Sequence, residues 1–212
     1  MLNEQSAFQE KKAKFVKKAP RKKASYISPK DSPIIPNKSV DDGVSYVWTK
    51  KPALLREYFQ IRYDAYTSYP GIMEFPQGLD TLDMRSNVCL AVKDGHCIGG
   101  VRHTVNDLLF DTPLPMEEED WRLRDIFPEY DLRRHRYGEY SRLALQHEYR
   151  YGKYAVGFTE RLIEKSLEHN LKYAFAVTPL VQARRYRHIC EFVFGLKFSI
   201  RRDVEVPPKP IH

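Results

Sequence analysis

Residues 87–105 read NVCLAVKDGHCIGGVRHTV, and this stretch predicts the centre of the fold. Two apolar runs, 87–93 and 96–105, are rich in strand-forming residues, and only Asp94 and Gly95 separate them. A two-residue Asp-Gly connection is a strong short-range signal for a β-hairpin, because both residues accept the positive φ angles of a tight hairpin turn. The stretch therefore predicts two antiparallel strands.

The segments on either side of this hairpin alternate between helix and strand patterns. Upstream, 45–49 reads as a strand, and Pro52 opens a run with helical spacing that ends before Pro70 and Gly71. An irregular loop is expected over 70–86. Downstream, the expected elements are a short helix within 116–127, a strand over 139–146, a helix over 154–170, a strand over 171–177, a helix over 180–194 that Gly195 closes, and a strand over 196–206. This order predicts the α/β or α+β class, with a mixed central sheet flanked by helices.

Positive charge is concentrated at the N-terminal end of the sequence. The 212 residues have a formal net charge of +7, and residues 1–40 hold ten Lys or Arg against three Asp or Glu. Residues 41–212 hold twenty-five of each. We therefore expect residues 1–43 to form a mostly disordered basic tail and residues 44–212 to form one domain. The tail is either a solubilising extension or a weak contact with nucleic acid or an anionic membrane surface.

The sequence disfavours membrane, metal and disulfide-bonded classes. It lacks the apolar core of a secretory signal, and no run approaches the roughly 18 apolar residues of a membrane span. Cys89, Cys97 and Cys190 include no Cys-x-x-Cys pair, and the seven His residues show no metal-ligand spacing. We expect reduced thiols, a cytoplasmic location, no stable membrane insertion, no metal and no permanently bound cofactor.

Four short motifs follow one another along the chain. They are Arg62-Tyr63-Asp64-Ala65-Tyr66 in the first helix, Asp80 and Asp83 in the following loop, Arg102 in the second hairpin strand, and Glu139, Ser141 and Arg142 in the next strand. This order of elements and motifs resembles the GNAT-type N-acyltransferases. Within that superfamily it is most similar to acyl-homoserine-lactone (autoinducer) synthases and N-acyl amino acid synthases. The resemblance implies a GNAT-like fold and transfer of an acyl group to an amine.

Two departures from the family pattern bear on the substrates. Autoinducer synthases have an aromatic pair before the aspartates, and here Phe75 or Tyr69 would stand there, with Tyr66 nearby as a further substrate-binding residue. Relatives that bind coenzyme A often have a glycine-rich turn at a helix N-terminus, where backbone N–H groups hold the pyrophosphate. The stretch YRYGKYAVG, residues 149–157, fits that pattern poorly. An acyl carrier protein is therefore the expected donor, and acyl-coenzyme A is the alternative.

The strand EYSRLAL, residues 139–145, carries polar groups that amide formation from a thioester needs. The attacking amine must lose a proton, and Glu139 is the candidate base, while Ser141 would orient it or the leaving thiolate. On a regular strand these two side chains share one face and Arg142 points to the other. The resemblance implies a bulged or splayed strand, which would aim backbone groups at the thioester carbonyl.

Three arginines accompany these carboxylates. Charges drawn into a cleft must be paired, so Arg62 and Arg142 are candidates to tether the Asp80–Asp83 loop over the acceptor site. Arg102 is the candidate to bind the carboxylate of an amino-acid acceptor, since a guanidinium and a carboxylate form a bidentate pair. The alternative is a structural ion-pair network with no catalytic member.

Two further groups of residues are candidates for the donor side. The candidates for an acyl channel are Phe175, Phe192, Phe194 and Phe198, and the alternative is that they are ordinary core residues. The candidates for docking an acidic carrier protein are Arg150, Lys153, Arg184 and Arg185, and the alternative is that they lie on solvated helix faces.

These patterns predict an N-acyltransferase that moves a fatty acyl group from acyl carrier protein to the amine of an amino acid, giving a long-chain N-acyl amino acid. The close alternative is an acyl-homoserine-lactone synthase that uses S-adenosylmethionine. A second alternative is a non-catalytic GNAT-like module that binds acyl groups or nucleic acid.

Overall fold

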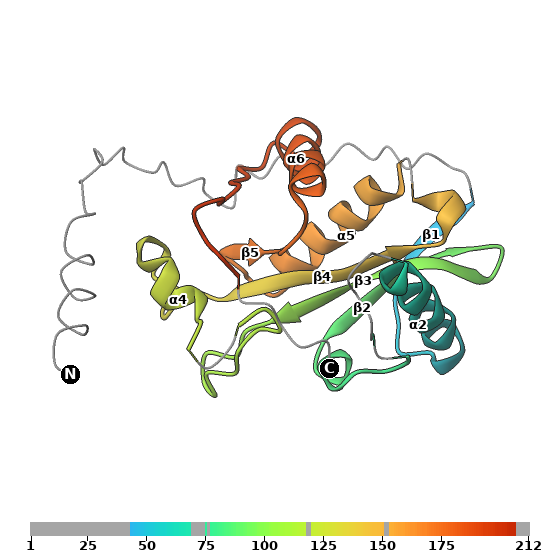
Figure 1. The fold of residues 1–212 in the computed structure, drawn as a ribbon, viewed down its shortest axis with the longest axis horizontal. Coiled ribbons are helices and arrows are strands. Elements are labelled where there is room, and N and C mark those ends of the chain that lie inside the picture. The colour runs from blue at the N-terminus through green and yellow to red at the C-terminus, as the bar shows by residue number, and fades with distance from the viewer. Residues whose placement is uncertain (1–42, 69–74, 76, 118–119, 151–152, 207–212) are drawn as a thin grey trace, which may run out of the picture. The chain divides into compact units, whose positions relative to one another are not determined.

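A five-stranded mixed sheet lies at the centre of the structure, a computed structural model that describes residues 43–68, 75, 77–117, 120–150 and 153–206 (Figure 1). The strands follow one another across the sheet in chain order. They are β1 (Val44–Trp48), β2 (Asn87–Lys93), β3 (His96–Val105), β4 (Tyr137–Leu145) and β5 (Tyr173–Phe175). Neighbouring strands from β1 to β4 are antiparallel, and β5 pairs with β4 in parallel.

Helices cover both faces of this sheet. The longer ones are α2 (Pro52–Thr67), α5 (Tyr154–Glu168) and α6 (Leu180–His188), which a π-helical turn, Ile189–Val193, extends. In Figure 1, α2 lies on one side of the sheet, while α5 and α6 lie on the other. Short helices α3 (Thr81–Met84) and α4 (Leu123–Ile126) and two 3₁₀ turns, Pro128–Tyr130 and His147–Tyr149, lie in the connections. The expected fold class, a mixed sheet flanked by helices, is confirmed.

Alternating side chains of β2 form two separate core layers. Val88 and Leu90 pack with Tyr58 of α2, while Cys89 and Ala91 pack with Phe158 of α5 on the opposite face. Because successive strand residues point to opposite faces, an uninterrupted apolar run such as 88–92 is suited to a sheet covered on both sides. Each large apolar side chain buried in this way contributes about 1.5–3 kcal/mol.

The hairpin predicted at residues 87–105 is confirmed. Asp94 and Gly95 have φ angles of 50° and 83°, the left-handed values that a two-residue hairpin turn requires. Gly195 ends the last helical segment with a φ of 65°, as expected from its position.

Four expectations about elements need correction. Residues 196–206 do not form a strand, and the expected loop 70–86 contains α3. The helix expected within 116–127 is limited to 123–126, and the strand expected over 171–177 to 173–175.

Side-chain contacts explain the missing final strand. Glu205 accepts a hydrogen bond through its carbonyl from Trp121 Nε1 at 3.0 Å, and Arg201 pairs with Glu129 at 3.0 Å and lies over the ring of Phe127. Residues 196–206 are therefore held by contacts with side chains of other segments rather than by a backbone ladder.

Some expectations fall outside the described residues. These are the basic tail, apart from Gly43, and the alternative aromatic residue Tyr69. Within the described part, no helix is both long and apolar enough to cross a membrane.

Candidate active site

A bulge in β4 sets the geometry of the candidate site. The register between β3 and β4 shifts between Gly100 and Arg102, and Arg142 on β4 has a φ of 58°. The extra residue resets the alternation, so Ala144 packs on the α2 side, whereas Leu143 and Leu145 pack on the α5 side. The bulge that the resemblance implied is therefore present.

The bulge also corrects the direction expected for Arg142. Its guanidinium lies 4.8 Å from the ring of Phe75 and 3.9 Å from Asp80, on the same side of the sheet as α2. Ser141 faces this side as well, because its Oγ accepts a hydrogen bond from Arg102 Nε at 3.2 Å. Regular alternation would have sent Arg142 to the opposite face from Ser141.

Asp80 and Asp83 form a capping box around α3. Asp80 accepts a hydrogen bond from the backbone N–H of Asp83 at 2.8 Å, and Asp83 accepts one from the N–H of Asp80 at 3.0 Å. This reciprocal arrangement satisfies two backbone donors at the start of the helix. It fixes both carboxylates, which are 8% and 2% exposed, in one orientation beneath the sheet.

Two buried arginines hold these carboxylates. Arg62 on α2 donates through Nη1 to Asp83 Oδ1 at 3.0 Å and through Nη2 to the carbonyl of Gly78 at 2.6 Å. Arg102 on β3 donates through Nη1 to both oxygens of Asp80 at 3.0 Å and to Asp83 at 3.3 Å. The sequence had suggested Arg62 and Arg142 as the tethers of this loop. In the structure, Arg62 and Arg102 hydrogen-bond to the aspartates, while Arg142 lies 3.9 Å from Asp80.

The electrostatic surroundings separate Arg62 from Arg142. Burial alone would lower the pKa of Arg62, but Tyr58, Asp83 and Asp80 outweigh it, and the pKa is raised. The pKa of Arg142 is lowered, first by burial and then by the neighbouring Arg102 cation. Arg62 is therefore a well-compensated buried cation and Arg142 a poorly compensated one.

An aromatic pair lies beside Arg142. The rings of Tyr66 and Phe75 stack with centroids 4.7 Å apart, and the Arg142 guanidinium approaches both rings. Phe75 is buried, and Arg62 approaches its ring as well, at 5.9 Å. The residues proposed from sequence to bind substrate are thus close to the arginine and aspartate cluster.

Glu139 lies two residues before Ser141 and is also buried, with 4% of the residue exposed. Its Oε2 accepts a hydrogen bond from the backbone N–H of Met116 at 2.6 Å. On β3 the partners of Glu139 and Ser141 are Thr104 and Arg102, so both carboxylate and hydroxyl face the α2 side. The structure brings the two proposed catalytic side chains to one face of the strand.

Strand β5 pairs with only the first part of β4. The parallel pairing covers Tyr137–Glu139 and Tyr173–Phe175, and no pairing with β5 is present from Tyr140 to Leu145. The pairing therefore ends at Glu139, opposite the last residue of β5. Among the described residues, the β5-facing edge of β4 from 140 to 145 is left without a strand partner, next to Ser141 and the bulge.

The four phenylalanines proposed for an acyl channel do not come together. Phe175 belongs to a cluster with Phe127 and Tyr137, whereas Phe194 packs with Ala155 and Ile189. Phe192 is 76% exposed, and Phe198 is half-buried. These residues therefore do not form one continuous apolar channel in this structure.

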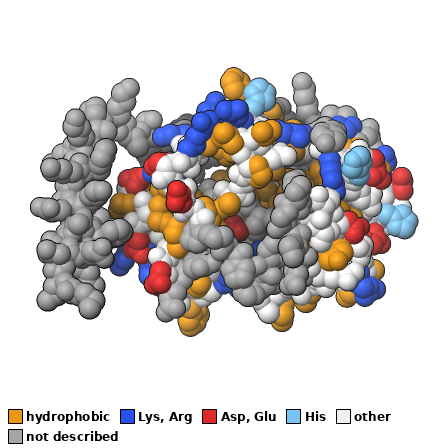
Figure 2. Space-filling model, in the orientation of Figure 1, with side chains coloured by type: hydrophobic (Ala, Val, Ile, Leu, Met, Phe, Trp, Pro, Cys, Tyr) orange, Lys and Arg blue, Asp and Glu red, His pale blue; other side chains and the backbone are white. Residues whose placement is uncertain are grey.

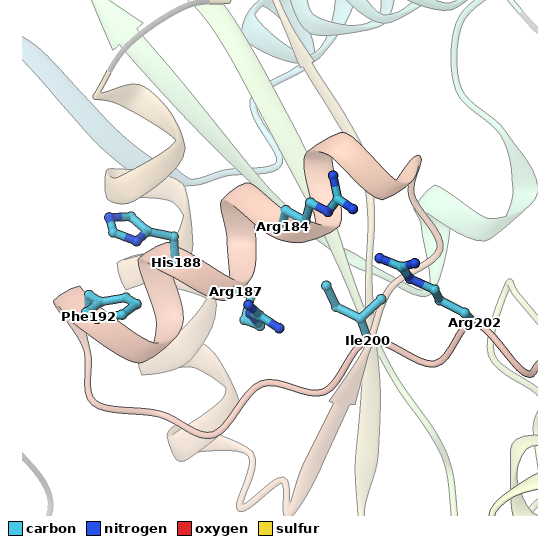
Figure 3. Close-up of a pocket in the computed structure, with 6 residues that line it drawn as sticks. All are labelled: Arg184, Arg187, His188, Phe192, Ile200 and Arg202. Atoms are coloured by element: carbon cyan, nitrogen blue, oxygen red, sulfur yellow. The ribbon is translucent and has the colours of Figure 1, made fainter.

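The proposed docking residues fall into two places. Figure 3 shows Arg184, Arg187, His188 and Phe192 of α6 and the following turn, together with Ile200 and Arg202. These six residues line a hollow of about 560 Å³. Arg150 instead lines a second hollow with Glu57 of α2 and His96 of β3. Lys153 is exposed just before α5, and Arg185 is half-buried on α6.

The hollow beside α6, hereafter the basic hollow, has little compensating negative charge. Arg187 pairs with Glu191 at 3.7 Å, but no carboxylate among the described residues lies within 4 Å of Arg184 or Arg202. Figure 2 shows Lys and Arg side chains gathered over this part of the surface. It can therefore attract an anionic partner.

The described residues contain no cluster of His, Cys, Asp and Glu that could hold a metal ion. Cys89, Cys97 and Cys190 are free thiols, and burial raises the pKa of Cys89 to about 12. Such a buried thiol is largely protonated at neutral pH and is a poor nucleophile.

Two contributors to the site were not predicted from sequence. Tyr58 donates its hydroxyl to the carbonyl of Arg142 at 2.6 Å, and the backbone N–H of Met116 binds Glu139. Tyr58 lies four residues before Arg62, which places both on one face of α2, and this spacing was the available signal. The contact from Met116 depends on a loop 23 residues away in sequence and had no local signal.

No protein-family model matches this chain, and no curated protein matches its sequence. Solved structures to which it is similar include an acetyltransferase from Trypanosoma brucei, with 10% identity, a TM-score of 0.48, and coverage of 75% of this chain and 96% of that one. A ribosomal-protein-alanine N-acetyltransferase from Brucella melitensis has 14% identity and a TM-score of 0.45 over 79% of this chain and 99% of that one.

A glucosamine-6-phosphate N-acetyltransferase from Arabidopsis thaliana has 6% identity and a TM-score of 0.47, over 76% of this chain and 97% of its own length. With TM-scores below 0.5, these likenesses assign neither an activity nor a substrate to this chain.

Proposed function

We propose that this chain is an N-acyltransferase that moves a fatty acyl group from a thioester to the amine of an amino acid. One observation carries the proposal. The Glu139 carboxylate and the Ser141 hydroxyl lie on one face of β4, where its pairing with β5 ends and the strand bulges at Arg142. A potential base, a hydroxyl and an unpaired strand edge thus occur together.

The unpaired edge of β4 suits the donor. A pantetheine arm is an extended chain with two amide groups, so it can pair with backbone N–H and C=O groups as an added strand would. This arm would leave its thioester close to the bulge, beyond the end of the pairing between β4 and β5. Backbone N–H groups at such a bulge are then available to stabilise the oxyanion that forms during acyl transfer.

The proposed reaction exchanges one bond for another. The neutral amine attacks the thioester carbonyl, a C–N bond forms, and collapse of the tetrahedral intermediate breaks the C–S bond. Glu139 accepts the proton of the amine, directly or through a water molecule, and the thiolate leaves as a thiol after taking up a proton. The hydrogen bond from the Met116 N–H holds this carboxylate in place on β4.

The basic hollow supports an acyl carrier protein as the donor. Carrier proteins are acidic, and Arg184 and Arg202 are cations without a carboxylate within 4 Å in the described part of the chain. Electrostatic complementarity of this kind steers association and fixes orientation. Acyl-coenzyme A stays the alternative donor. Because acyl carrier proteins donate in the cytoplasm, we place the reaction there.

A product assay with a matched variant tests this proposal. Purified protein is incubated with acyl carrier protein loaded with a fatty acyl chain and with a mixture of amino acids, and thiol release and amide products are measured. Glu139→Gln keeps the size of the side chain but removes the base, so we expect kcat to fall by about 10²–10⁴-fold with an unchanged thermal melt. The loss should shrink as the pH approaches the pKa of the acceptor amine.

Other outcomes separate the alternatives. An acyl-homoserine lactone formed from S-adenosylmethionine, with no N-acyl amino acid, would indicate the autoinducer reaction. Thiol release and amide formation that stay absent with every donor and acceptor would contradict an enzymatic role. A Glu139→Gln variant with an unchanged melt and near-normal kcat at neutral pH would exclude Glu139 as the base.

A further inference from the structure

Three arginines lie around the two aspartates that cap α3. Arg62, Arg102 and Arg142 face Asp80 and Asp83. Each oxygen of both carboxylates already accepts at least one hydrogen bond at 3.0 Å or less, from Arg62, Arg102 or the capping box. Both aspartates are therefore already engaged by Arg62, Arg102 and the backbone of the capping box.

Arg142 is the arginine left over. Its nearest carboxylate oxygen among the described residues is Asp80 Oδ2 at 3.9 Å, beyond hydrogen-bond distance. By contrast, the side chains of Arg62 and Arg102 donate bonds of 2.6–3.3 Å. A partly desolvated guanidinium with unused donors is costly unless an anion completes its surroundings. The lowered pKa of Arg142 agrees with this lack of compensation.

Arg142 is also the only one of the three that a ligand can reach. Its side chain is 20% exposed, whereas those of Arg62 and Arg102 are 0% and 2% exposed. The Phe75 and Tyr66 rings lie beside its guanidinium and limit its orientation. The N–H groups of a guanidinium lie in its plane, so stacking over a ring does not block them. They can then donate two parallel hydrogen bonds to a carboxylate.

We propose that Arg142 binds the carboxylate of the acceptor, and that the acceptor is therefore an α-amino acid or another amine bearing a carboxylate close to the attacking nitrogen. The inference rests on the proposed acyl transfer. Arg142 is one residue from Ser141 and three from Glu139, so a carboxylate bound here holds its neighbouring amine near the base. This assigns to Arg142 the role that the sequence suggested for Arg102, whose Nη1 is occupied by the aspartates.

Matched acceptors that differ only in the carboxylate test this assignment. An amino acid, its methyl ester and its amide are compared with one acyl donor, in the wild type and in Arg142→Gln. We expect Arg142→Gln to lower kcat/KM for the free acid by about 10- to 100-fold, the worth of one charge-assisted hydrogen bond. For the ester and the amide the change should be less than about threefold, because neither has the negative charge.

Two controls make the result decisive. Arg142→Lys keeps the charge but not the planar pair of donors, so it should restore only part of the activity on the free acid. Arg161→Gln, on the opposite face of the sheet in α5, should leave the ratio of acid to ester unchanged. Thermal melts of all variants show whether folding is affected.

The outcomes distinguish this inference from the proposed function. An equal loss for acid, ester and amide would overturn the carboxylate assignment and point to a contact with the donor, while acyl transfer itself would stand. A wild type that prefers the ester or the amide to the acid would also overturn it. If no acceptor is acylated by the wild type, the proposed function fails and the inference fails with it.

Discussion

Arg62 and Arg142 show how a side chain's surroundings, rather than its type, decide what it can do. Arg62 is fully buried and meets a carboxylate and a backbone carbonyl, so its charge is compensated within the fold. Arg142 is held away from Asp80 by a bulge in its own strand, so its charge is available to a ligand. A positive φ at one residue therefore separates a structural arginine from a candidate binding residue.

His103 is a second buried residue whose surroundings leave its polar atoms unused. It is 0% exposed on the α5 side of β3, and neither ring nitrogen has a hydrogen-bond partner among the described residues. Its ring lies near Trp48, Tyr140 and His169. Burial, followed by the charges of His169 and Lys165, lowers the pKa of His103 to about 4.

This histidine predicts a loss of stability in mild acid. Above pH 6.5 the ring is neutral in both the folded and the unfolded chain. Protonation of His103 then takes nothing from the free energy of unfolding. As the pH falls from about 6.5 to about 4, only the unfolded chain binds the proton, so unfolding becomes easier by about 3 kcal/mol in total. Urea unfolding at pH 7 and pH 5 measures the difference.

A variant isolates the contribution of His103 from those of other groups. His103→Leu removes the titrating ring and its unbonded nitrogens, so the fall in stability between pH 7 and pH 5 should be smaller than in the wild type. The other titrating groups, including the carboxylates and His169, are present in both proteins. The contribution of His103 is therefore the difference between the two falls in stability. The same fall in both proteins would show that His103 is not the source.

At the scale of single residues, sequence patterns identified charged residues that the structure brings together, but not how they bond. Arg62, Asp80, Asp83, Arg102 and Glu139 were identified from motif order, and all are buried in the structure. Which arginine meets which aspartate was not predictable, since it depends on the bulge and on the capping box. Spacing along a strand indicates a face only while the strand stays regular.

At the scale of elements, the candidate active site depends on a close approach of β3 and β4 to α2. Gly100 lies where a Cβ atom would come within 2.7 Å of both Leu90 and the ring of Tyr58. Tyr58 in turn donates its hydroxyl to the carbonyl of the bulge residue Arg142. The small residue in β3 thus lets α2 support the bulge.

Gly100→Ala tests this contact between elements. We expect a loss of about 1–3 kcal/mol in the free energy of unfolding, because the added methyl group overpacks a filled core. Activity per folded molecule should fall as well, since Tyr58 must move away from the bulge carbonyl. Tyr58→Phe, which removes only the hydroxyl, serves as the comparison. A Gly100→Ala protein with wild-type stability and activity would contradict this account.

The elements themselves differ in how far local sequence determines them. The hairpin at 87–105 follows from local sequence, because the two strand-forming runs and the Asp-Gly turn between them all favour the same structure. The segment 196–206 has an alternating pattern but makes side-chain contacts to Trp121, Phe127 and Glu129 instead. Strand patterns show that alternate residues are buried, but not whether a neighbouring backbone is present to pair with them.

At the scale of the molecule, the distribution of charge matters more than the net charge. Residues 41–212 contain equal numbers of basic and acidic residues, yet Arg184 and Arg202 line one hollow and have no carboxylate within 4 Å in the part of the chain that the structure describes. The acidic residues are used elsewhere, for example around α3 and in pairs such as Arg201 with Asp203. A balanced domain can therefore present a locally basic surface (Figures 2 and 3).

This uneven distribution predicts a specific dependence on salt. If an acidic carrier protein docks at the basic hollow, its KM should rise steeply with ionic strength, because salt screens charges over about 10 Å at 0.1 M. The KM for a small acyl-pantetheine donor should change little. In the double variant Arg184→Gln/Arg202→Gln, the KM for the carrier protein should be high at low salt already and nearly independent of added salt. The matched control is Arg134→Gln, because the Arg134 side chain is 82% exposed and lies outside the hollow's lining; this variant should keep the wild-type dependence on salt.

Two outcomes would exclude the basic hollow as the docking surface. One is an equal salt dependence of KM for the carrier protein and for the small donor, and the other is a double variant that behaves as the wild type.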